Sequence, residues 1–247
     1  MIHCGLAHSG SWGRVARTLS GALTMTAFDT PGHGRSDAWD GRDEIQKLTA
    51  EIAADFLTQP TDVIGHSFGA TVALRLAVMR PELVRSLTLI EPVFFAVALA
   101  DRPEIAPAFK ASQSDFGTAM ERGDTLTAAR DFTRIWGDGT PWEVIPKDVQ
   151  QSLADQMYLI MASHDALNND VGGMLEEGVL DALHCPVLLM EGSKSPAIIR
   201  DINNGLSARL PNTTHAMIMG AAHMAPITHA DQVAVEVLRF LDQSKET

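Results

Sequence analysis

The sequence predicts an α/β domain, a mostly parallel sheet flanked by helices and interrupted by a helical insertion. Short apolar runs alternate with segments of helical periodicity, and this strand–helix–strand order favours right-handed crossovers between parallel strands. The alternation stops at Pro92 and resumes at Cys185, with helical segments and no convincing strand between them. A chain of 247 residues is long enough for one such domain with an insertion.

The elements before the interruption are predicted from apolar spacing and from the residues that break each run. Residues 23–28 read as a strand that ends in a loop of turn-forming residues at 29–34. The next elements are a helix at 45–57, a strand at 61–64, a helix at 69–80 that Pro81 stops, and a strand at 84–90.

The insertion and the closing part of the chain are predicted in the same way. Helices are expected at 115–122, 125–136 and 146–162, then a strand at 185–190, a helix at 198–209, a strand near 214–219 and an amphipathic helix at 231–241. We therefore expect a core of residues 1–92 and 181–247 and a helical cap of residues 93–180.

Composition and charge exclude several classes of protein. Hydrophobic residues are 45% and charged residues 20% of the chain, an ordinary globular mixture. The net charge of −12 repels phosphate backbones, so we expect no nucleic-acid partner. No apolar run approaches the roughly 18 residues that span a bilayer, so we expect no membrane partner.

The N-terminal residues and the two cysteines are used to predict the cellular compartment of the protein. Residues 1–5 contain no basic segment and no apolar segment of a secretory signal. Cys4 and Cys185 form neither a disulfide framework nor a metal-ligand cluster. The sequence therefore predicts a cytoplasmic protein with reduced thiols.

The strongest chemical signal is the segment Gly65-His66-Ser67-Phe68-Gly69. It follows a predicted strand and opens a predicted helix, which is the setting of a nucleophile elbow that exposes a serine hydroxyl. Small residues are needed at both ends because neighbouring backbone comes close. The alternative is a glycine-rich turn with a capping serine.

Four motifs in this order resemble the α/β-hydrolase family over nearly the whole chain, and the helical insertion lies where that family places its cap. They are His3-Cys4-Gly5 with Trp12 nine residues after His3, the loop 29–36, the segment 65–69, and the loop 220–226.

The resemblance implies roles for several residues. Ser67 would be the nucleophile and His223 the general base that takes the serine proton and returns it to the leaving group. Two backbone N–H groups would form the oxyanion hole. The resemblance assigns them to Phe68 and Gly5, with Leu6 as the neighbouring option.

Three further residues of these motifs are expected to be structural. His66 is taken as a neighbour of the nucleophile, and His33 is expected to brace a loop. Cys4 stands where the family usually has glycine and is interpreted as a small buried residue, with a thiol nucleophile as the alternative.

The acid that orients His223 is left open by the sequence. The family usually places an aspartate shortly after the strand that ends at about residue 190, but that position appears here as Ser195. Some members take the acid from the end of the preceding strand, which here is Glu91. A carboxylate directly after a buried strand is costly unless it is paired, which favours Glu91. Glu191 is the second choice and Asp201 the third.

One departure from the family concerns the N-terminus. Only Met1 and Ile2 precede His3, so we expect either that the strands which the family places before this loop are lost or that this reading frame starts at an internal methionine. Such a sheet exposes ladder groups, which a homodimer could cover.

The sequence thus predicts a serine hydrolase for a small carboxylic ester, which needs neither a metal nor an organic cofactor. Lactones, thioesters and carbon–carbon bonds are alternative substrates of the same constellation. A non-catalytic ligand-binding or degenerate member of the fold is the alternative of another class.

The cap is expected to shape the substrate pocket. It has no basic cluster, which predicts a neutral or weakly polar acyl group. Its candidate pocket residues are aromatic or methionine, namely Phe94, Phe95, Phe109, Phe116, Phe132, Trp136, Trp142 and Met157.

Overall fold

The computed structural model describes residues 1–244, which form a four-stranded sheet in which every strand is parallel to its neighbours. The strands run in the order β1 (Thr61–His66), β2 (Val84–Ile90), β3 (Val187–Gly192) and β4 (Thr213–Ile218). β1, β2 and β3 are buried along most of their length, which explains why they read as continuous apolar runs rather than alternating ones.

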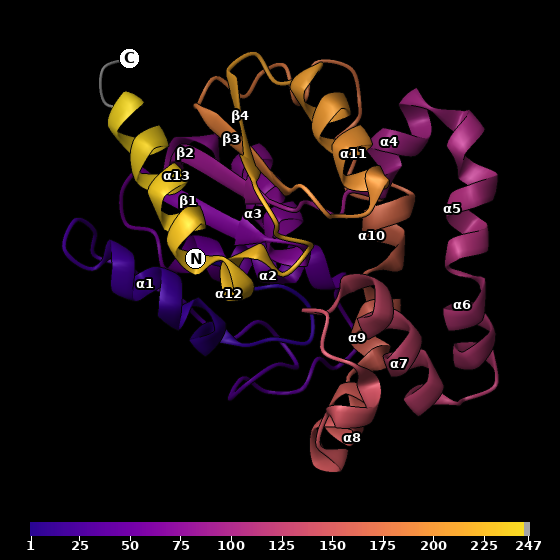
Figure 1. Ribbon diagram of the computed structural model, residues 1–247. Coiled ribbons are helices and arrows are strands. Elements are labelled where there is room, and N and C mark those ends of the chain that lie inside the picture. Colours follow the sequence, from indigo (N-terminus) through magenta and orange to yellow (C-terminus); the bar gives the residue numbers. More distant parts are fainter. Residues whose placement is uncertain (245–247) are drawn as a thin grey trace.

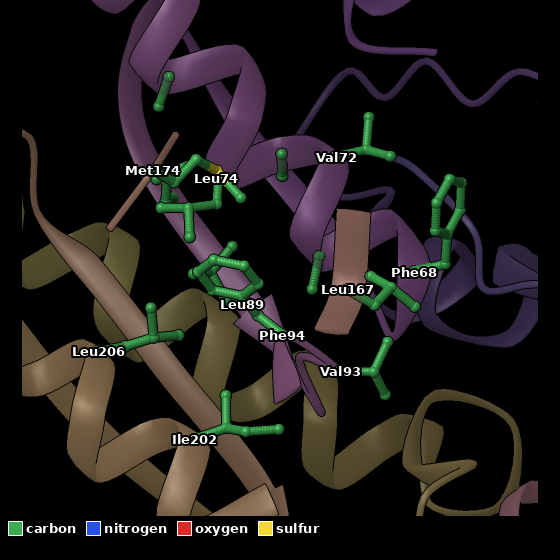
Figure 2. Packing of buried hydrophobic residues seen from close by; sticks show 14 of the residues in the cluster. Phe68, Val72, Leu74, Leu89, Val93, Phe94, Leu167, Met174, Ile202 and Leu206 are labelled. Atoms are coloured by element: carbon green, nitrogen blue, oxygen red, sulfur yellow. The ribbon is translucent and has the colours of Figure 1, made fainter. Parts of the chain in front are cut away.

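Helices cover both faces of the sheet (Figure 1). Helices α1 (Gly13–Leu19) and α13 (Ala230–Gln243) pack with Ile90 and Met190 on one face. On the other face, Leu87 and Leu89 pack with helices of the second layer. Figure 2 shows part of this second cluster. The helices of the second layer are α2 (Ile45–Asp55), α3 (Phe68–Met79) and α11 (Ala197–Ser207).

The segment between β2 and β3 contains seven α-helices up to Asn168 and no strand, and most of these helices lie on the side of the molecule opposite α1 (Figure 1). Within it, α6 to α9 share a small alanine-rich cluster centred on Met157, whereas α4 packs against α11. The helices are α4 (Phe95–Asp101), α5 (Ala106–Ser112), α6 (Ser114–Glu121), α7 (Thr125–Trp136), α8 (Lys147–Asp155), α9 (Met157–Ala162) and α10 (His164–Asn168).

Short elements complete the chain. They are α12 (Ala225–Thr228) and the 3-10 helices Ser9–Trp12, Pro81–Leu83, Pro103–Ile105 and Trp142–Val144. The single helix predicted over 146–162 is divided at Gln156 into α8 and α9. Among residues 1–244, no helix combines the length and the apolar character that a membrane crossing requires.

The strand predicted over residues 23–28 is wrong, because this segment forms no strand. Its alternation correctly marks burial, since Leu23, Met25 and Ala27 pack against the α1 and α13 cluster. A strand also needs a neighbouring ladder. The chain beside it contributes one hydrogen bond from the Met1 amino group to the Thr26 carbonyl, 2.7 Å long, while Ile2 forms a single bridge to Gly65 of β1.

The two glycines of the 65–69 segment lie where backbone crosses backbone. A Cβ on Gly65 would collide with the carbonyl group of Gly69, and a Cβ on Gly69 would collide with the carbonyl groups of Ile2 and His3. The turn can therefore close only with glycine at both positions, and this closure fixes the start of α3 against the N-terminal segment.

This crowding gives a stability prediction. Gly65→Ala is expected to lower the free energy of unfolding by about 1–3 kcal/mol, because the obstructing atoms are backbone and cannot move aside. Gly117→Ala in α6 is the matched control, since no atom lies within 4 Å of its added Cβ, and it should be neutral or stabilising by up to about 1 kcal/mol. Urea denaturation of both variants measures the difference, and equal effects would contradict the packing argument.

Candidate active site

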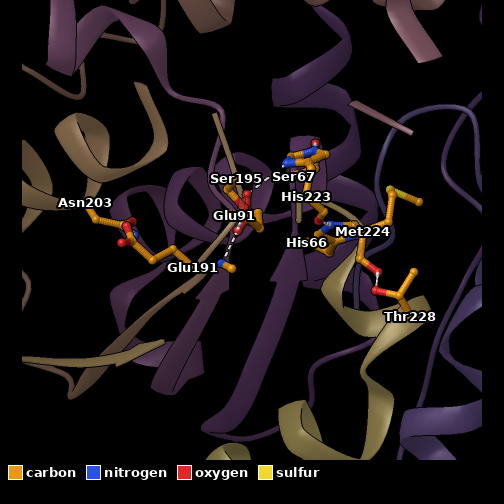
Figure 3. A network of polar contacts seen from close by, with 10 residues as sticks. His66, Ser67, Glu91, Glu191, Ser195, Asn203, His223, Met224 and Thr228 are labelled. Atoms are coloured by element: carbon orange, nitrogen blue, oxygen red, sulfur yellow. Dashed lines mark hydrogen bonds and ion pairs between the residues drawn. The ribbon is translucent and has the colours of Figure 1, made fainter. Parts of the chain in front are cut away.

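Three polar side chains meet at the carboxyl-terminal edge of the sheet. Ser67 directly follows β1, Glu91 directly follows β2, and His223 lies in the loop after β4. Parallel strands present their carboxyl ends at the same edge, which brings these residues together although up to 156 positions separate them (Figure 3).

The three side chains form a continuous hydrogen-bonded chain. The Ser67 hydroxyl lies 2.9 Å from His223 Nε2, and His223 Nδ1 lies 3.0 Å from Glu91 Oε2. A carboxylate only accepts hydrogen bonds, so His223 donates its Nδ1–H to Glu91 and its Nε2 is free to accept the serine proton. Ser67 retains 8% exposure, while His223 is 2% exposed and Glu91 is fully buried.

Glu91 is held by two further donors on its other oxygen. Glu91 Oε1 accepts hydrogen bonds from the Gly192 amide at 2.5 Å and from the Ser195 hydroxyl at 2.6 Å. Donors aimed at a buried carboxylate offset the cost of removing it from water. Ser195, at the position where the family usually has its acid, thus contacts the carboxylate that follows the neighbouring strand.

The alternative acids lie elsewhere. Glu191 pairs with Arg200 at 3.0 Å and with Asn203 at 3.2 Å, on the side away from His223 (Figure 3). Asp201 pairs with Arg102 at 2.6 Å. Of the three candidate carboxylates, only Glu91 is in hydrogen-bond contact with His223.

Unusual backbone conformations gather at the site. The φ angles of Leu6, Ser67 and Glu91 are 61°, 56° and 52°, and among residues 1–244 the only other non-glycine residue with positive φ is Asp170. Such angles cost a side-chain-bearing residue roughly 1–3 kcal/mol each unless the surroundings impose them. Here the surrounding packing turns Ser67 and Glu91 out of their strands and toward His223.

Two backbone N–H groups next to Ser67 are without a partner. Gly5 and Phe68 line the same cavity as Ser67, and no hydrogen bond of either amide is found within residues 1–244. The Leu6 amide, the neighbouring option from the sequence, already donates to His33 Nε2 at 3.0 Å. The geometry therefore favours Gly5 over Leu6 as the second donor.

Two histidines join the loop that carries Gly5 to the loop 29–36, and each accepts a hydrogen bond from the backbone of the other loop. His3 Nε2 accepts from the Thr30 amide at 2.9 Å, and His33 Nε2 accepts from the Leu6 amide. Burial lowers the pKa of His3 to about 4 and also lowers the pKa of His33, so both rings stay neutral and keep an acceptor nitrogen. The predicted bracing role of His33 agrees with this geometry.

His66 lies behind His223 rather than beside the nucleophile hydroxyl. Its Nε2 lies 2.8 Å from the carbonyl oxygen of His223, to which it donates, and the two rings are 5.3 Å apart. Burial lowers the pKa of His66 to about 3, with the neighbouring His223 adding to the effect. His66 therefore fixes the backbone of the histidine loop as a neutral donor.

These neutral histidines make stability depend on pH. Below pH 6.5, His3, His33 and His66 become protonated in the unfolded chain but stay neutral in the folded protein, because their pKa values are lowered there. The free energy of unfolding should therefore fall as the pH drops from 6.5 to 4.5. Each group contributes at most about 1.4 kcal/mol per pH unit. The lowered pKa of Asp29 adds to the fall only from about pH 5 downward, because an unfolded aspartate titrates near pH 3.9.

The measurement is urea denaturation at pH 6.5, 5.5 and 4.5. His66→Gln removes one such group and should reduce the slope by about one proton. His184→Gln, at an exposed position, is the matched control and should leave the slope unchanged. A pH-independent stability in the parent protein would contradict the assignment of neutral buried rings.

A cavity of about 440 Å³ opens above Ser67 and has a mostly apolar wall. Five of the eight pocket residues predicted from the sequence line it, namely Phe95, Phe109, Phe116, Phe132 and Trp136. The other three do not line it. Phe94 is buried in the core against the sheet, while Met157 and Trp142 pack in the small cluster of the inserted helices.

Other wall residues were not singled out by the sequence. Leu99, Ile160 and Leu167 line the cavity, as do two polar residues of α5 and its C-terminal boundary, Lys110 and Gln113. Apolar residues on short helices carry no signal that separates a cavity wall from a core. Gly192 and Ser195 were also not identified as partners of Glu91, although a hydroxyl in the expected acid position was a usable signal.

Cys4 lines the cavity beside Gly5. Burial raises the pKa of its thiol to about 12, so the nucleophilic thiolate form is scarce at neutral pH. The interpretation of Cys4 as a small buried residue agrees with this environment.

Comparison with known proteins identifies the family of the chain. The profile of the Alpha/beta hydrolase family matches residues 1–237, and the chain belongs to this family. The lipase LipV of Mycobacterium tuberculosis is 29% identical over 246 residues, covering 96% of this chain and 90% of that protein. The pimeloyl-[acyl-carrier protein] methyl ester esterase of Nitrosomonas europaea is 38% identical over 105 residues, covering 42% of this chain and 40% of that protein.

Solved structures agree on the fold. MGS-M2, an alpha/beta hydrolase enzyme from a Medee basin deep-sea metagenome library, has a TM-score of 0.76 at 15% identity and covers 98% of this chain and 87% of its own. MenH from S. aureus has a TM-score of 0.68 at 16% identity, with 99% and 92% covered. The predicted fold class is confirmed, and the chain is an enzyme of a family whose curated relatives are named esterases and lipases.

Proposed function

We propose that the protein is a serine hydrolase that cleaves small carboxylic esters through an acyl-enzyme on Ser67. The observation that carries the proposal is the chain of contacts from Ser67 Oγ to His223 Nε2 and from His223 Nδ1 to Glu91, at 2.9 and 3.0 Å, at the inner end of an apolar cavity. A serine hydroxyl is a weak nucleophile until a neighbouring base takes its proton, and this geometry supplies that base.

In the first half of the reaction, Ser67 Oγ bonds to the ester carbonyl carbon while His223 Nε2 takes the hydroxyl proton. The carbonyl π electrons move to the oxygen, and the resulting oxyanion is stabilised by the Phe68 and Gly5 amides. When the tetrahedral intermediate collapses, the bond to the alcohol oxygen breaks. His223 returns the proton to that oxygen, which leaves the acyl group on Ser67 and releases the alcohol.

Water completes the cycle. His223 takes a proton from a water molecule whose oxygen attacks the acyl carbon, and it then returns the proton to Ser67 Oγ as the carboxylic acid leaves. Glu91 holds the ring in the tautomer that exposes Nε2 and stabilises the imidazolium in both halves. The two donors on Glu91 Oε1 keep the carboxylate in that orientation.

The cavity supports a small, mainly apolar acyl group. Its volume of about 440 Å³ lies within the range of small-molecule sites, and the aromatic rings along its wall suit a hydrocarbon chain. Trp136 packs its ring 4.8 Å from the His223 ring, so the acyl group would displace water directly beside the reacting atoms. Relatives named esterase and lipase support ester cleavage over the other reactions of this constellation.

A fluorophosphonate probe tests the proposal without knowledge of the substrate. Such a probe reacts with an activated serine, so mass spectrometry of the labelled protein should show one adduct per chain, on Ser67. Rates of hydrolysis of a series of esters, lactones and thioesters then show which of these substrate classes is preferred. Folded protein that takes up no probe and cleaves no ester would overturn the proposed function.

A further inference from the structure

The cavity above Ser67 has a mouth whose character differs from that of its wall. The exposed lining residues are Lys110 of α5, Met161 of α9 and His164 of α10, and the half-buried polar residues Gln113 and Asn168 belong to the same two parts of the inserted segment. The inner end holds Ser67, Phe68 and His223. A substrate that fills the cavity therefore has its ester at the buried end and another part at this polar mouth.

Lys110 is the only residue of the cavity lining with a permanent charge. It is exposed yet lines the cavity, which is the arrangement of a lysine whose hydrocarbon stem covers apolar wall while its ammonium group stays in water. Within residues 1–244, no hydrogen bond or ion pair of the Lys110 ammonium group is found, so a substrate need not displace a partner to reach it.

The charge at the mouth is opposite to that of its surroundings. Residues 93–180 contain six lysines and arginines against fourteen aspartates and glutamates, but no carboxylate lines the cavity. Exposed charges act over about 10 Å at ordinary salt, so Lys110 attracts an anion at the mouth although the chain as a whole is negative. The carboxylate next to the mouth, Asp165, already has His164 Nδ1 at 3.3 Å and accepts from the Asn169 amide at 2.8 Å.

We propose, resting on the proposed esterase function, that Lys110 binds a carboxylate at the far end of the acyl chain, so that the preferred substrates are half-esters of aliphatic dicarboxylic acids. A single ammonium group matches a carboxylate, whereas phosphate sites usually gather several donors or a bidentate arginine. The apolar wall holds the methylene chain, and Gln113 adds an amide donor beside Lys110. This proposal departs from the sequence-based expectation of a neutral or weakly polar acyl group, which rested on the absence of a basic cluster, because here a single lysine supplies the charge.

The test compares substrates that differ only at the far end. Monomethyl octanedioate carries a carboxylate, methyl octanoate a methyl group, and methyl 8-hydroxyoctanoate a neutral hydroxyl at the same chain length. Lys110→Gln should lower kcat/KM for the half-ester about three- to tenfold through KM, with kcat unchanged. The two neutral esters should change less than twofold, and Lys110→Arg should keep the preference for the half-ester.

Lys147→Gln is the matched control. Lys147 also lies on an inserted helix, but it pairs with Gln150 at 3.0 Å and does not line the cavity. It should leave all three esters unchanged. Equal effects of Lys110→Gln on charged and neutral esters, or a loss that Lys147→Gln reproduces, would overturn the Lys110 site while Ser67 labelling still supported the esterase. Absence of both labelling and ester cleavage would instead overturn the proposed function.

Discussion

Replacing Ser67 by alanine is expected to lower kcat for a small ester by about 10⁴- to 10⁶-fold. The other hydroxyl of the cavity wall, Ser163, donates to the Ile160 carbonyl and has no histidine within residues 1–244 to take its proton. Cys4 is the nearest alternative nucleophile by position, and the raised pKa of its buried thiol keeps it protonated. The fluorophosphonate adduct should disappear in the same variant.

The fold should survive this change. The Ser67 side chain makes no capping hydrogen bond to α3, and its hydrogen-bond partner within residues 1–244 is His223 Nε2. The melting temperature and the affinity for a non-cleavable ester analogue should therefore stay close to those of the parent protein. Activity within tenfold of the parent would contradict the role of Ser67, and purification from a host that lacks background esterase controls for contamination.

Replacing Glu91 by glutamine is expected to lower kcat by roughly 10³- to 10⁴-fold. An amide of the same shape can present its N–H to His223 Nδ1, which would favour the tautomer with the proton on Nε2 and remove the acceptor for the Ser67 proton. It also withdraws the negative charge that stabilises the imidazolium. The loss should lie in kcat, with KM for the ester little changed.

Glu191→Gln is the matched control, since Glu191 is the adjacent carboxylate in β3 and pairs with Arg200 and Asn203 instead of His223. Its kcat should stay within a fewfold of the parent value. A near-silent Glu91→Gln together with a crippling Glu191→Gln would reverse the assignment of the acid.

Much of the sheet could be predicted because buried parallel strands read as apolar runs that breakers end. The runs at β1, β2 and β3 are of this kind, and Pro81 follows the end of α3 as predicted. The segment 23–28 shows the limit. Its alternation records which side chains are buried, but strand pairing depends on a neighbour that no local pattern contains.

The active site likewise has some features that the sequence predicts and others that it does not. The local turn around Ser67 is visible in sequence because backbone crowding demands glycine at fixed positions. Glu91 and Glu191 follow the paired residues Ile90 and Met190, so strand alternation alone does not separate them. The positive φ of Glu91, which turns its carboxylate toward His223, is set by the surrounding packing and has no local sequence signal. The cavity wall was only partly predicted for a related reason, since Phe94 and Phe95 are neighbours in sequence yet only Phe95 lines the cavity.

The inserted helices α4 to α10 supply most of the cavity wall, but Ser67, Glu91 and His223, together with the Gly5 and Phe68 amides, all come from residues outside these helices. The residues that react with the ester and the residues that contact its acyl chain thus lie in different segments of the sequence. Substitutions of cavity-wall residues such as Phe116 and Phe132, which lie outside the main core cluster's buried set, can therefore change the preferred ester while Ser67, His223 and Glu91 keep their contacts. Substrate preference can therefore evolve by substitutions in the inserted helices without changes in the residues that cleave the ester.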